Sequence, residues 1–564
     1  MVSKCQRVLK RTKTKLFDLI TRRCLVKGSS LRFEGDVQSV FTPLKVDGII
    51  ERIGKENIID VVEKQASGLY YIFDYEPYKP GRLSDLWFRD LYSGYCWNRK
   101  DYFRDTKLRP KKLVDIKVPW EASRLYHLSN FAFGYEITNK KKYRDLGFSY
   151  LMEFIECNPP NKGINWFYSM EVSIRLINII LFVDILSNKG DKIPEEVDEY
   201  ILLSINHILN NLEWRGGVRN NHYYISLFGL LFGCKRFLSS KEYRRIYDFA
   251  LKEIFLETSY HIMDDGGGAE LSTGYHKLNL EALYLFEQVV GNVKYNDIIF
   301  NKKFYFENLM IPIELKNRKL TLNQFSDFYS KVDLARGFYA SIVNESFEHP
   351  QIGDNDSGCI FKLHPYKNNG YGWSRLCYFL TRYEAGEQHH ISKFNHISFY
   401  DQSSSFKLLT KGIEVEGLLS AESYNNFGLH VIRSDNFLFT VKDLPDAAIP
   451  GHSHDDYMSI TLCIGDKWLY RDNGTFSYNT ERDEYFEGKN QTNHNVRVIG
   501  GDIKGHLSLS YSDSGHFVVM YRDIVIFILA KDDKGFSIYC SDRILVEKRP
   551  YFPDYYIDKV DCKL

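Results

Sequence analysis

Two histidines separated by one residue are the first side chains in this sequence whose types and spacing could do chemistry. The stretch PGHSHDDYMSITL contains His452 and His454 and leads into an apolar run with a period of two. Residues i and i+2 of a strand point to the same face, so a strand starting here would place both imidazoles on one side. Asp455 and Asp456 are expected to begin this strand, with Asp456 on the face of the histidines.

A metal site is one interpretation of this pair. Asp472 follows across an expected hairpin at Gly465-Asp466, and His494 lies further on, in the stretch TNHNV. Histidines and an aspartate on neighbouring strands would form a nitrogen and oxygen site with open positions, which suits zinc. Surface histidines and turn aspartates are common, so the alternative is that these residues bind no ion.

A second group of polar residues interrupts the helical part of the sequence. The stretch WRGGVRNNHYYIS places Asn220, Asn221 and His222 at the start of an expected helix, shortly after Trp214. Amides at this position can bind a substrate anion. The alternative is ordinary helix capping, for which Asn is strongly preferred.

A third group lies in the stretch DDGGGAELSTGYHKLNLEALY. Three glycines precede Glu270, and Tyr275 and His276 then lead into another expected helix. Glycine permits backbone turns that most residues cannot adopt, and it also leaves room for a bulky substrate. A tyrosine at a helix start can act in catalysis, and the alternative is that it only packs.

The elements that must position these residues change rhythm along the chain. Between about residues 120 and 347 the apolar period is three to four, which predicts successive antiparallel helices in an α/α toroid or helical solenoid. After about residue 353 the period is two, which predicts short antiparallel strands in a β-sandwich. The expected domains are a mixed segment with a basic arm (1–100), a toroid (101–350) and a sandwich (351–564).

Composition limits the class of partner. The chain has 564 residues, with 74 Lys and Arg against 73 Asp and Glu, so no overall field favours nucleic acid or a membrane surface. We predict no transmembrane segment, because no stretch approaches the length of an apolar span. The 10 cysteines are scattered without CxxC spacing, which favours a reducing compartment. The basic N-terminus shows no signal-peptide core, which indicates a cytoplasmic location.

Eight stretches in a fixed order resemble those of heparinase II/III-type polysaccharide lyases. They are WEASRLYHL, NPPNKGINWFYSMEVSIRLIN, RNNHYYISL, DDGGGAELSTGYH, IGDNDSG, GHSHDDYMSITL, YRDNGT and TNHNV, and they span roughly residues 115–498. The resemblance implies a multi-domain α+β fold, with an N-terminal incomplete (α/α) toroid, a C-terminal antiparallel β-sandwich and an active site in the cleft between them. It also implies a location in the cell envelope or periplasm, in contrast to the N-terminus.

The resemblance implies that an acidic, uronate-containing polysaccharide is cleaved by β-elimination. Asn221 would then neutralise the sugar carboxylate, with Asn220 as the alternative one position earlier, and His222 would assist or orient the loop. Tyr275 would protonate the leaving oxygen, and either His452 or Tyr275 would take the C5 proton. Further expected substrate contacts are Glu270, His276 and Trp214. His454, Asp472 and His494 would hold a structural zinc ion.

Two other functions fit the same sequence. One is a non-degradative protein that binds or remodels capsule or surface polysaccharide on the same scaffold. The other is a glycoside hydrolase, which would need two opposed carboxylates and could take them from Glu270, Asp264 and Asp265. The stretch IGDNDSG has only part of a calcium loop, and we expect Asp354 within it to lie in a turn that joins the two halves. The oligomeric state is not predicted.

Overall fold

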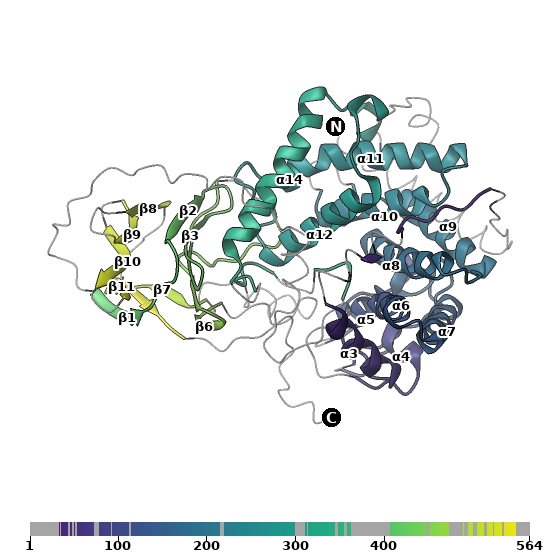
Figure 1. The fold of residues 1–564 in the computed structure, drawn as a ribbon, viewed down its shortest axis with the longest axis horizontal. Coiled ribbons are helices and arrows are strands. Elements are labelled where there is room, and N and C mark those ends of the chain that lie inside the picture. The colour runs from purple at the N-terminus through teal and green to yellow at the C-terminus, as the bar shows by residue number, and fades with distance from the viewer. Residues whose placement is uncertain are drawn as a thin grey trace.

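The fold has a helical half and a β half at opposite ends of an elongated molecule (Figure 1). The computed structural model describes residues 33–548 except 34, 43–45, 48–49, 51–53, 73–77, 92, 112–113, 215–218, 299–310, 313, 345–347, 355–357, 363–405, 447–450, 473–488, 490–493, 500–504, 512–515, 523 and 533–534. The predicted basic arm falls outside these residues.

Four helices of the helical half are buried on nearly every side. They are α6 (Tyr126–Thr138), α8 (Ser169–Asn188), α10 (Asn221–Lys235) and α12 (Thr273–Val290). A helix that is apolar all round must be enclosed by other elements. These four contact one another in chain order, α6 with α8, α8 with α10 and α10 with α12, and so form the inner layer of the helical half.

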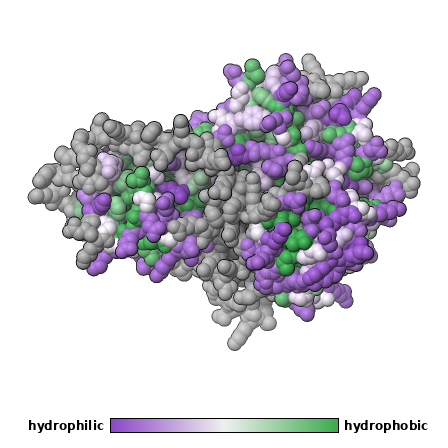
Figure 2. Space-filling model, in the orientation of Figure 1, coloured by the Kyte–Doolittle hydropathy of each residue, from purple (hydrophilic) through white to green (hydrophobic). Residues whose placement is uncertain are grey.

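The helices that alternate with them are exposed along part of their length and form the outer layer. They are α7 (Lys141–Cys157), α9 (Glu195–Asn210), α11 (Lys241–His261) and α14 (Leu322–Ile342). Each is amphipathic in sequence, as expected for a helix with one side in water. The alternation of enclosed and amphipathic helices is the arrangement of an incomplete (α/α) toroid, so the predicted fold of this half is confirmed. Figure 2 shows a mainly hydrophilic surface over this half.

Shorter elements extend the toroid at its N-terminal side. They are α3 (Lys55–Ala66), α4 (Leu83–Phe88) and α5 (Lys117–Ser123), with 3₁₀ turns η1 (Phe103–Asp105) and η2 (Ile164–Trp166). Further 3₁₀ turns η3 (Tyr295–Asp297) and η4 (Leu315–Asn317) lie between α12 and α14. Trp87 of α4 and Trp120 of α5 belong to the same hydrophobic core as the inner helices. The described part of the first hundred residues therefore packs onto the toroid.

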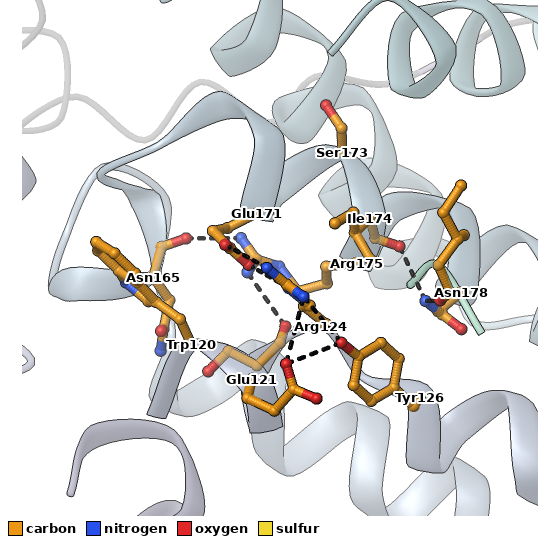
Figure 3. Close-up of polar contacts among 12 residues, drawn as sticks. Trp120, Glu121, Arg124, Tyr126, Asn165, Glu171, Ser173, Ile174, Arg175 and Asn178 are labelled. Atoms are coloured by element: carbon orange, nitrogen blue, oxygen red, sulfur yellow. Dashed lines mark hydrogen bonds and ion pairs between the residues drawn. The ribbon is translucent and has the colours of Figure 1, made fainter. Parts of the chain in front are cut away.

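A buried ion network lies inside this core (Figure 3). The Arg124 guanidinium donates to both oxygens of Glu171, at 2.7 and 2.8 Å, and to Glu121 at 3.3 Å. Tyr126 completes the network by donating to Glu121 at 3.0 Å. Glu121, Arg124 and Glu171 therefore form buried ion pairs.

The β half contains two five-stranded antiparallel sheets. One has the order β2-β3-β4-β5-β6, from strands Ser420–Tyr424, Leu429–Arg433, Phe437–Lys442, Ile460–Ile464 and Lys467–Tyr470. The other has the order β1-β11-β10-β9-β8, from Phe406–Ile413, Gly535–Ser541, Ile524–Asp532, Phe517–Tyr521 and Leu507–Tyr511. A separate pair joins β7 (Val496–Val498) to β12 (Ile544–Val546). The predicted antiparallel β-sandwich and the hairpin at Gly465-Asp466 are confirmed.

The sheet β2–β6 is covered on both faces. Phe439 packs on Phe527 of the other sheet, with ring centroids 5.9 Å apart, whereas Leu438 on the opposite face joins a core with Phe338 of α14. Strands covered on both faces are apolar at consecutive positions rather than alternating, and all six residues of β4 are buried. Contact with α14 therefore fixes this sheet against the toroid (Figure 1).

A segment that follows α14 returns into the toroid before the chain enters the β half. Cys359, Ile360 and Phe361 are buried in the core of the helical half. The backbone N–H groups of Ile360 and Phe361 donate to the Glu281 carboxylate of α12, at 2.7 and 3.3 Å, and Lys362 reaches Glu121 at 3.1 Å. Residues 359–362 of the connection between the halves are therefore part of the toroid interior.

Among the described helices, none combines the length and the apolar character that a membrane crossing requires. The boundaries predicted at residues 100 and 350 stay predictions, since α14 ends at Ile342, β1 begins at Phe406, and much of the chain between them lies outside the described residues.

Candidate functional site

The candidate residues of the helical half lie on the first turns of two inner helices. Asn221 is the first residue of α10, and Tyr275 is in the first turn of α12. Asn220 is the residue before α10 but makes no side-chain capping bond, so the alternative that this asparagine caps the helix is wrong. At the other helix start, Ser272 caps α12 by accepting a hydrogen bond from the Tyr275 backbone N–H at 3.2 Å. Both helix starts were predicted correctly.

Glu270 supplies the missing cap of α10. Its Oε1 accepts from the Asn221 backbone N–H at 2.6 Å, and its Oε2 accepts from the Asn221 side-chain Nδ2 at 3.1 Å. A carboxylate at the N-terminus of a helix is stabilised by the unpaired N–H groups and by the macrodipole. Glu270 therefore fixes the backbone and the side chain of Asn221 together.

Asn221, Glu270 and Tyr275 form the helical wall of the site, and His452 of the β half contacts this wall. His452 Nε2 lies 3.5 Å from Glu270 Oε2, and the His452 ring stacks on the Tyr275 ring with centroids 3.7 Å apart and 21° between planes. Asn221, Glu270, Tyr275 and His452, which span 231 positions of sequence, thus form one cluster. All four side chains are buried.

The expected strand geometry of the His-x-His pair is wrong. Strand β5 begins only at Ile460, and residues 451–459 form turns, with Met458 at a φ of 65°. Asp455 and Asp456 therefore do not begin a strand, and alternation does not orient the imidazoles. Asp354 orients them instead.

Asp354 belongs to this cluster by its contacts, and the sequence did not reveal them. Its Oδ2 accepts from His452 Nδ1 at 3.0 Å and from Lys489 Nζ at 2.8 Å, and its Oδ1 lies 2.8 Å from His454 Nε2. Burial acts to raise the pKa of Asp354, but the hydrogen bonds from both histidines outweigh it and hold the pKa well below its usual range. The predicted turn is present at Gly353, whose φ is 69°.

The signal that could have found Asp354 is the IGDNDSG stretch itself, in which glycine precedes an acidic residue. An added Cβ at Gly353 would lie 2.5 Å from the Leu271 carbonyl oxygen and 2.7 Å from that of His452. Only a glycine permits this approach at positive φ. The turn therefore inserts Asp354 between the helical and β walls of the site.

The three residues expected to bind zinc lie close together beside this cluster. The ring centroids of His454 and His494 are 5.4 Å apart, and His494 Nδ1 lies 2.6 Å from Asp472 Oδ2. His454 Nδ1 and His494 Nε2 are buried and have no hydrogen-bond partner among the described residues. Two such nitrogens on neighbouring rings fit a metal ion, although the described residues hold no group of three already arranged as its ligands.

His222 follows Asn221 in α10 and is partly exposed. Its Nδ1 is 2.8 Å from Glu213 Oε2, and its ring packs edge-on against Tyr168. Burial acts to lower the pKa of His222, but the Glu213 carboxylate outweighs burial and raises the pKa. His222, the residue after Asn221, therefore favours its protonated, positively charged form.

Trp214 and His276 lie in other clusters. The Trp214 ring is buried, packs edge-on against Tyr223 and lies beneath the Arg219 and Arg318 guanidinium groups at 5.1 and 5.0 Å. His276 Nε2 is 3.1 Å from the Ala335 carbonyl oxygen of α14, and burial lowers the pKa of His276 to about 4. Sugar contact by either residue stays a prediction.

The glycines before Glu270 serve packing. Gly266 has a φ of 87°, and an added Cβ would lie 2.2 Å from the Leu334 carbonyl oxygen of α14; at Gly267 it would lie 2.6 Å from the Phe427 side chain. These contacts bring the loop against α14 and the β half.

The aspartates considered for a hydrolase are also engaged in structural contacts. Asp265 accepts from the Gly267 and Phe427 backbone N–H groups at 3.0 and 2.9 Å, and Asp264 is exposed and pairs with Lys331 at 2.5 Å. Neither contact places a carboxylate opposite Glu270.

Part of the helical half is similar to a known protein family. Residues 90–327 match the Heparinase II/III N-terminus. A crystal structure of heparinase III is 14% identical, with 86% of this chain and 72% of that chain covered and a TM-score of 0.49. Heparan sulfate lyase HepC from Pedobacter heparinus is 15% identical, with 87% and 67% covered and a TM-score of 0.40.

No curated protein sequence matches this chain. The match at residues 90–327 contains Asn221, Glu270 and Tyr275, which form the helical wall of the site, and the fold of both halves agrees with the expected toroid and sandwich. Residues 90–327 of this chain, which include the helical part of the site, are thus similar to the Heparinase II/III N-terminus.

Proposed function

We propose that this protein is a polysaccharide lyase that cleaves an acidic, uronate-containing glycan by β-elimination. The observation that carries the proposal is the single cluster formed by Asn221, Glu270, Tyr275 and His452 from two halves of the molecule. It combines an amide, a phenol and an imidazole, the groups that this reaction needs. The printed names of the similar structures, heparinase III and heparan sulfate lyase, support the same reaction class.

The first requirement is to weaken the negative charge of the sugar carboxylate. The C5 proton is acidic only when charge can move onto that carboxylate, so hydrogen-bond donors must stabilise it. Asn221 Nδ2 carries two hydrogens, of which one is directed to Glu270, and the second would bind the substrate. His222, whose pKa is raised by Glu213, adds a positive charge beside it. Asn220, partly exposed just before the helix, remains the alternative amide.

The second requirement is a base for C5 and an acid for the leaving oxygen. The base removes the C5 proton, the electron pair forms the C4–C5 double bond, and the C4–O4 bond breaks. Tyr275 would protonate O4, and His452 or Tyr275 would accept the C5 proton. Their rings are in contact, so both can reach neighbouring atoms of one sugar ring.

A zinc ion is part of the proposal as a structural element. His454 through Nδ1 and His494 through Nε2 would hold it, and Asp472, the third residue predicted at this site, bonds His494 on the Nδ1 side of the ring. Such a bond to a carboxylate is how metal-binding histidines are usually oriented. The ion would stabilise the turn that carries His452.

The proposal is tested by incubating the protein with heparan, chondroitin, alginate and bacterial capsular uronates and following the ultraviolet absorbance of the new double bond. Product from at least one polymer, abolished in His452→Ala, is the expected result. Glycan binding without unsaturated product would favour a non-degradative protein, and water incorporated at new chain ends would favour a hydrolase. Either result would overturn the lyase.

A further inference from the structure

One buried carboxylate contacts both histidines of the His-x-His pair. Asp354 reaches His452 through Oδ2 and His454 through Oδ1, at 3.0 and 2.8 Å. An ionised carboxylate can only accept hydrogen bonds, so each imidazole must donate. His452 is then protonated at Nδ1 and His454 at Nε2, which are opposite nitrogens of the two rings.

The nitrogens left over face two different sites. His452 Nε2 lies 3.5 Å from Glu270 Oε2, within the cluster that also contains Tyr275. The His454 ring lies 5.4 Å from the His494 ring, and His454 Nδ1 has no hydrogen-bond partner among the described residues. Asp354 binds Nδ1 of His452 and Nε2 of His454. His452 is therefore left with Nε2 toward the proposed sugar site, and His454 with Nδ1 toward the proposed zinc site.

Asp354 is itself held on several sides. Its backbone N–H donates to the His452 carbonyl oxygen at 2.9 Å, and its own carbonyl oxygen accepts from Ser272 Oγ, the cap of α12, at 2.6 Å. Lys489 binds the carboxylate at 2.8 Å and also donates to the Gly451 carbonyl oxygen at 2.9 Å. The carboxylate is therefore fixed relative to both walls before any substrate binds.

We propose that Asp354 is the positioning residue of this site, which sets the tautomer and the direction of both His452 and His454. An imidazole without such a partner exchanges between two tautomers, and a neutral ring protonated at Nε2 cannot take a proton from C5. The same carboxylate leaves Nδ1 of His454 unprotonated toward His494, as a metal ligand requires. The tautomers follow from the contacts alone, whereas the effect on catalysis rests on the proposed lyase function.

The test measures the tautomers directly. Long-range ¹H–¹⁵N NMR of protein with ring-labelled histidine, assigned with His452→Gln and His454→Gln, should show a proton on Nδ1 of His452 and on Nε2 of His454. In Asp354→Asn the single amide oxygen can accept from only one ring, so at least one histidine should change its protonated nitrogen. For a polymer that is cleaved, kcat should fall about 10²-fold or more with KM unchanged, because orientation and not sugar binding is lost.

The matched control is Asp443→Asn. Asp443 is a buried carboxylate of the β half that lies 3.4 Å from His430 Nε2, away from the cluster. This variant should keep the tautomers of His452 and His454 and should keep kcat.

Wild-type protein with His452 protonated only at Nε2 overturns the proposal, and that measurement decides even if Asp354→Asn does not fold. Unchanged tautomers in a folded Asp354→Asn variant also overturn it. If the wild type makes no unsaturated product, the lyase function fails, while the tautomer measurement still decides the role of Asp354.

Discussion

The two walls of the site are positioned by different means. The helical wall presents Asn221 and Tyr275 from the first turns of buried helices, where Glu270 and Ser272 cap the backbone within 50 positions of sequence. The β wall presents His452 from a turn outside any strand, held by Asp354 from 98 positions away. The helical wall is thus set by contacts within the helical half, and the β wall depends on a contact with the segment that follows α14.

The largest expected effect is loss of the acid in the helical wall. Tyr275→Phe removes one hydroxyl and keeps the ring that stacks on His452. A positioned acid or base contributes about 10²–10⁴-fold, so kcat should fall by that factor. The absorbance assay measures it, with Tyr224→Phe as control because that buried hydroxyl bonds Thr258 outside the cluster. Equal activity in both variants would remove Tyr275 from the mechanism.

The next effect concerns how each half is stabilised, by buried ions in the toroid and by apolar packing in the sandwich. Glu171→Gln leaves the Arg124 guanidinium with less negative charge in a buried site. Breaking such a pair costs about 3–5 kcal/mol. Urea unfolding should show this loss, whereas Glu136→Gln, which disrupts a partly exposed pair with Lys189, should cost less than about 1 kcal/mol. Similar losses in both variants would contradict an ionic core.

The pH response should separate the halves. Burial lowers the pKa of three toroid histidines from 6.5, His127 to about 4 and His207 and His261 to about 3. The unfolded chain then binds protons that the folded helical half does not. Stability of this half is fully present above pH 6.5 and falls toward pH 4, by about 1.4 kcal/mol per pH unit for each histidine.

The β half should respond in the opposite direction. Burial acts to lower the pKa of His494, but Asp472 outweighs it and raises the pKa to about 9. The contribution of His494 is therefore full below pH 6.5 and is lost as pH rises through about 9. Proteolysis in urea of chelator-treated protein, with fragments assigned to each half by mass spectrometry, should show the two trends. A common pH midpoint for both halves would contradict this prediction.

The smallest effect tests the contact between the walls. Ser272 caps α12 and also donates to the Asp354 carbonyl oxygen, whereas Ser240 caps α11, an outer helix, through Glu242. Replacing either by Ala should cost about 0.5–2 kcal/mol in unfolding free energy. Only Ser272→Ala should also reduce kcat. If Ser240→Ala reduces kcat by the same factor, the effect of Ser272→Ala comes from lost stability and not from its contact with Asp354.

Periodicity predicted the helices and strands, and the ordered stretches predicted which residues meet. The helix starts near Asn221 and Tyr275 follow from the apolar period of α10 and α12, although the cap of α10 comes from Glu270, 49 positions away. The period-two apolar run predicts a strand that begins beside His452 and His454, but turns extend to residue 459. Asp354 was missed because its partners are about 100 positions away and no local pattern marks a carboxylate that bonds two imidazoles.

The return of residues 359–362 into the toroid has a consequence for dividing the protein. A recombinant helical half ending at Ile342, the end of α14, would lack Ile360 and Phe361, and would leave the Glu281 carboxylate without two of its donors. It would also remove Lys362 from Glu121. A fragment intended to fold alone must extend through residue 362, so the natural cut between the halves lies beyond the last helix.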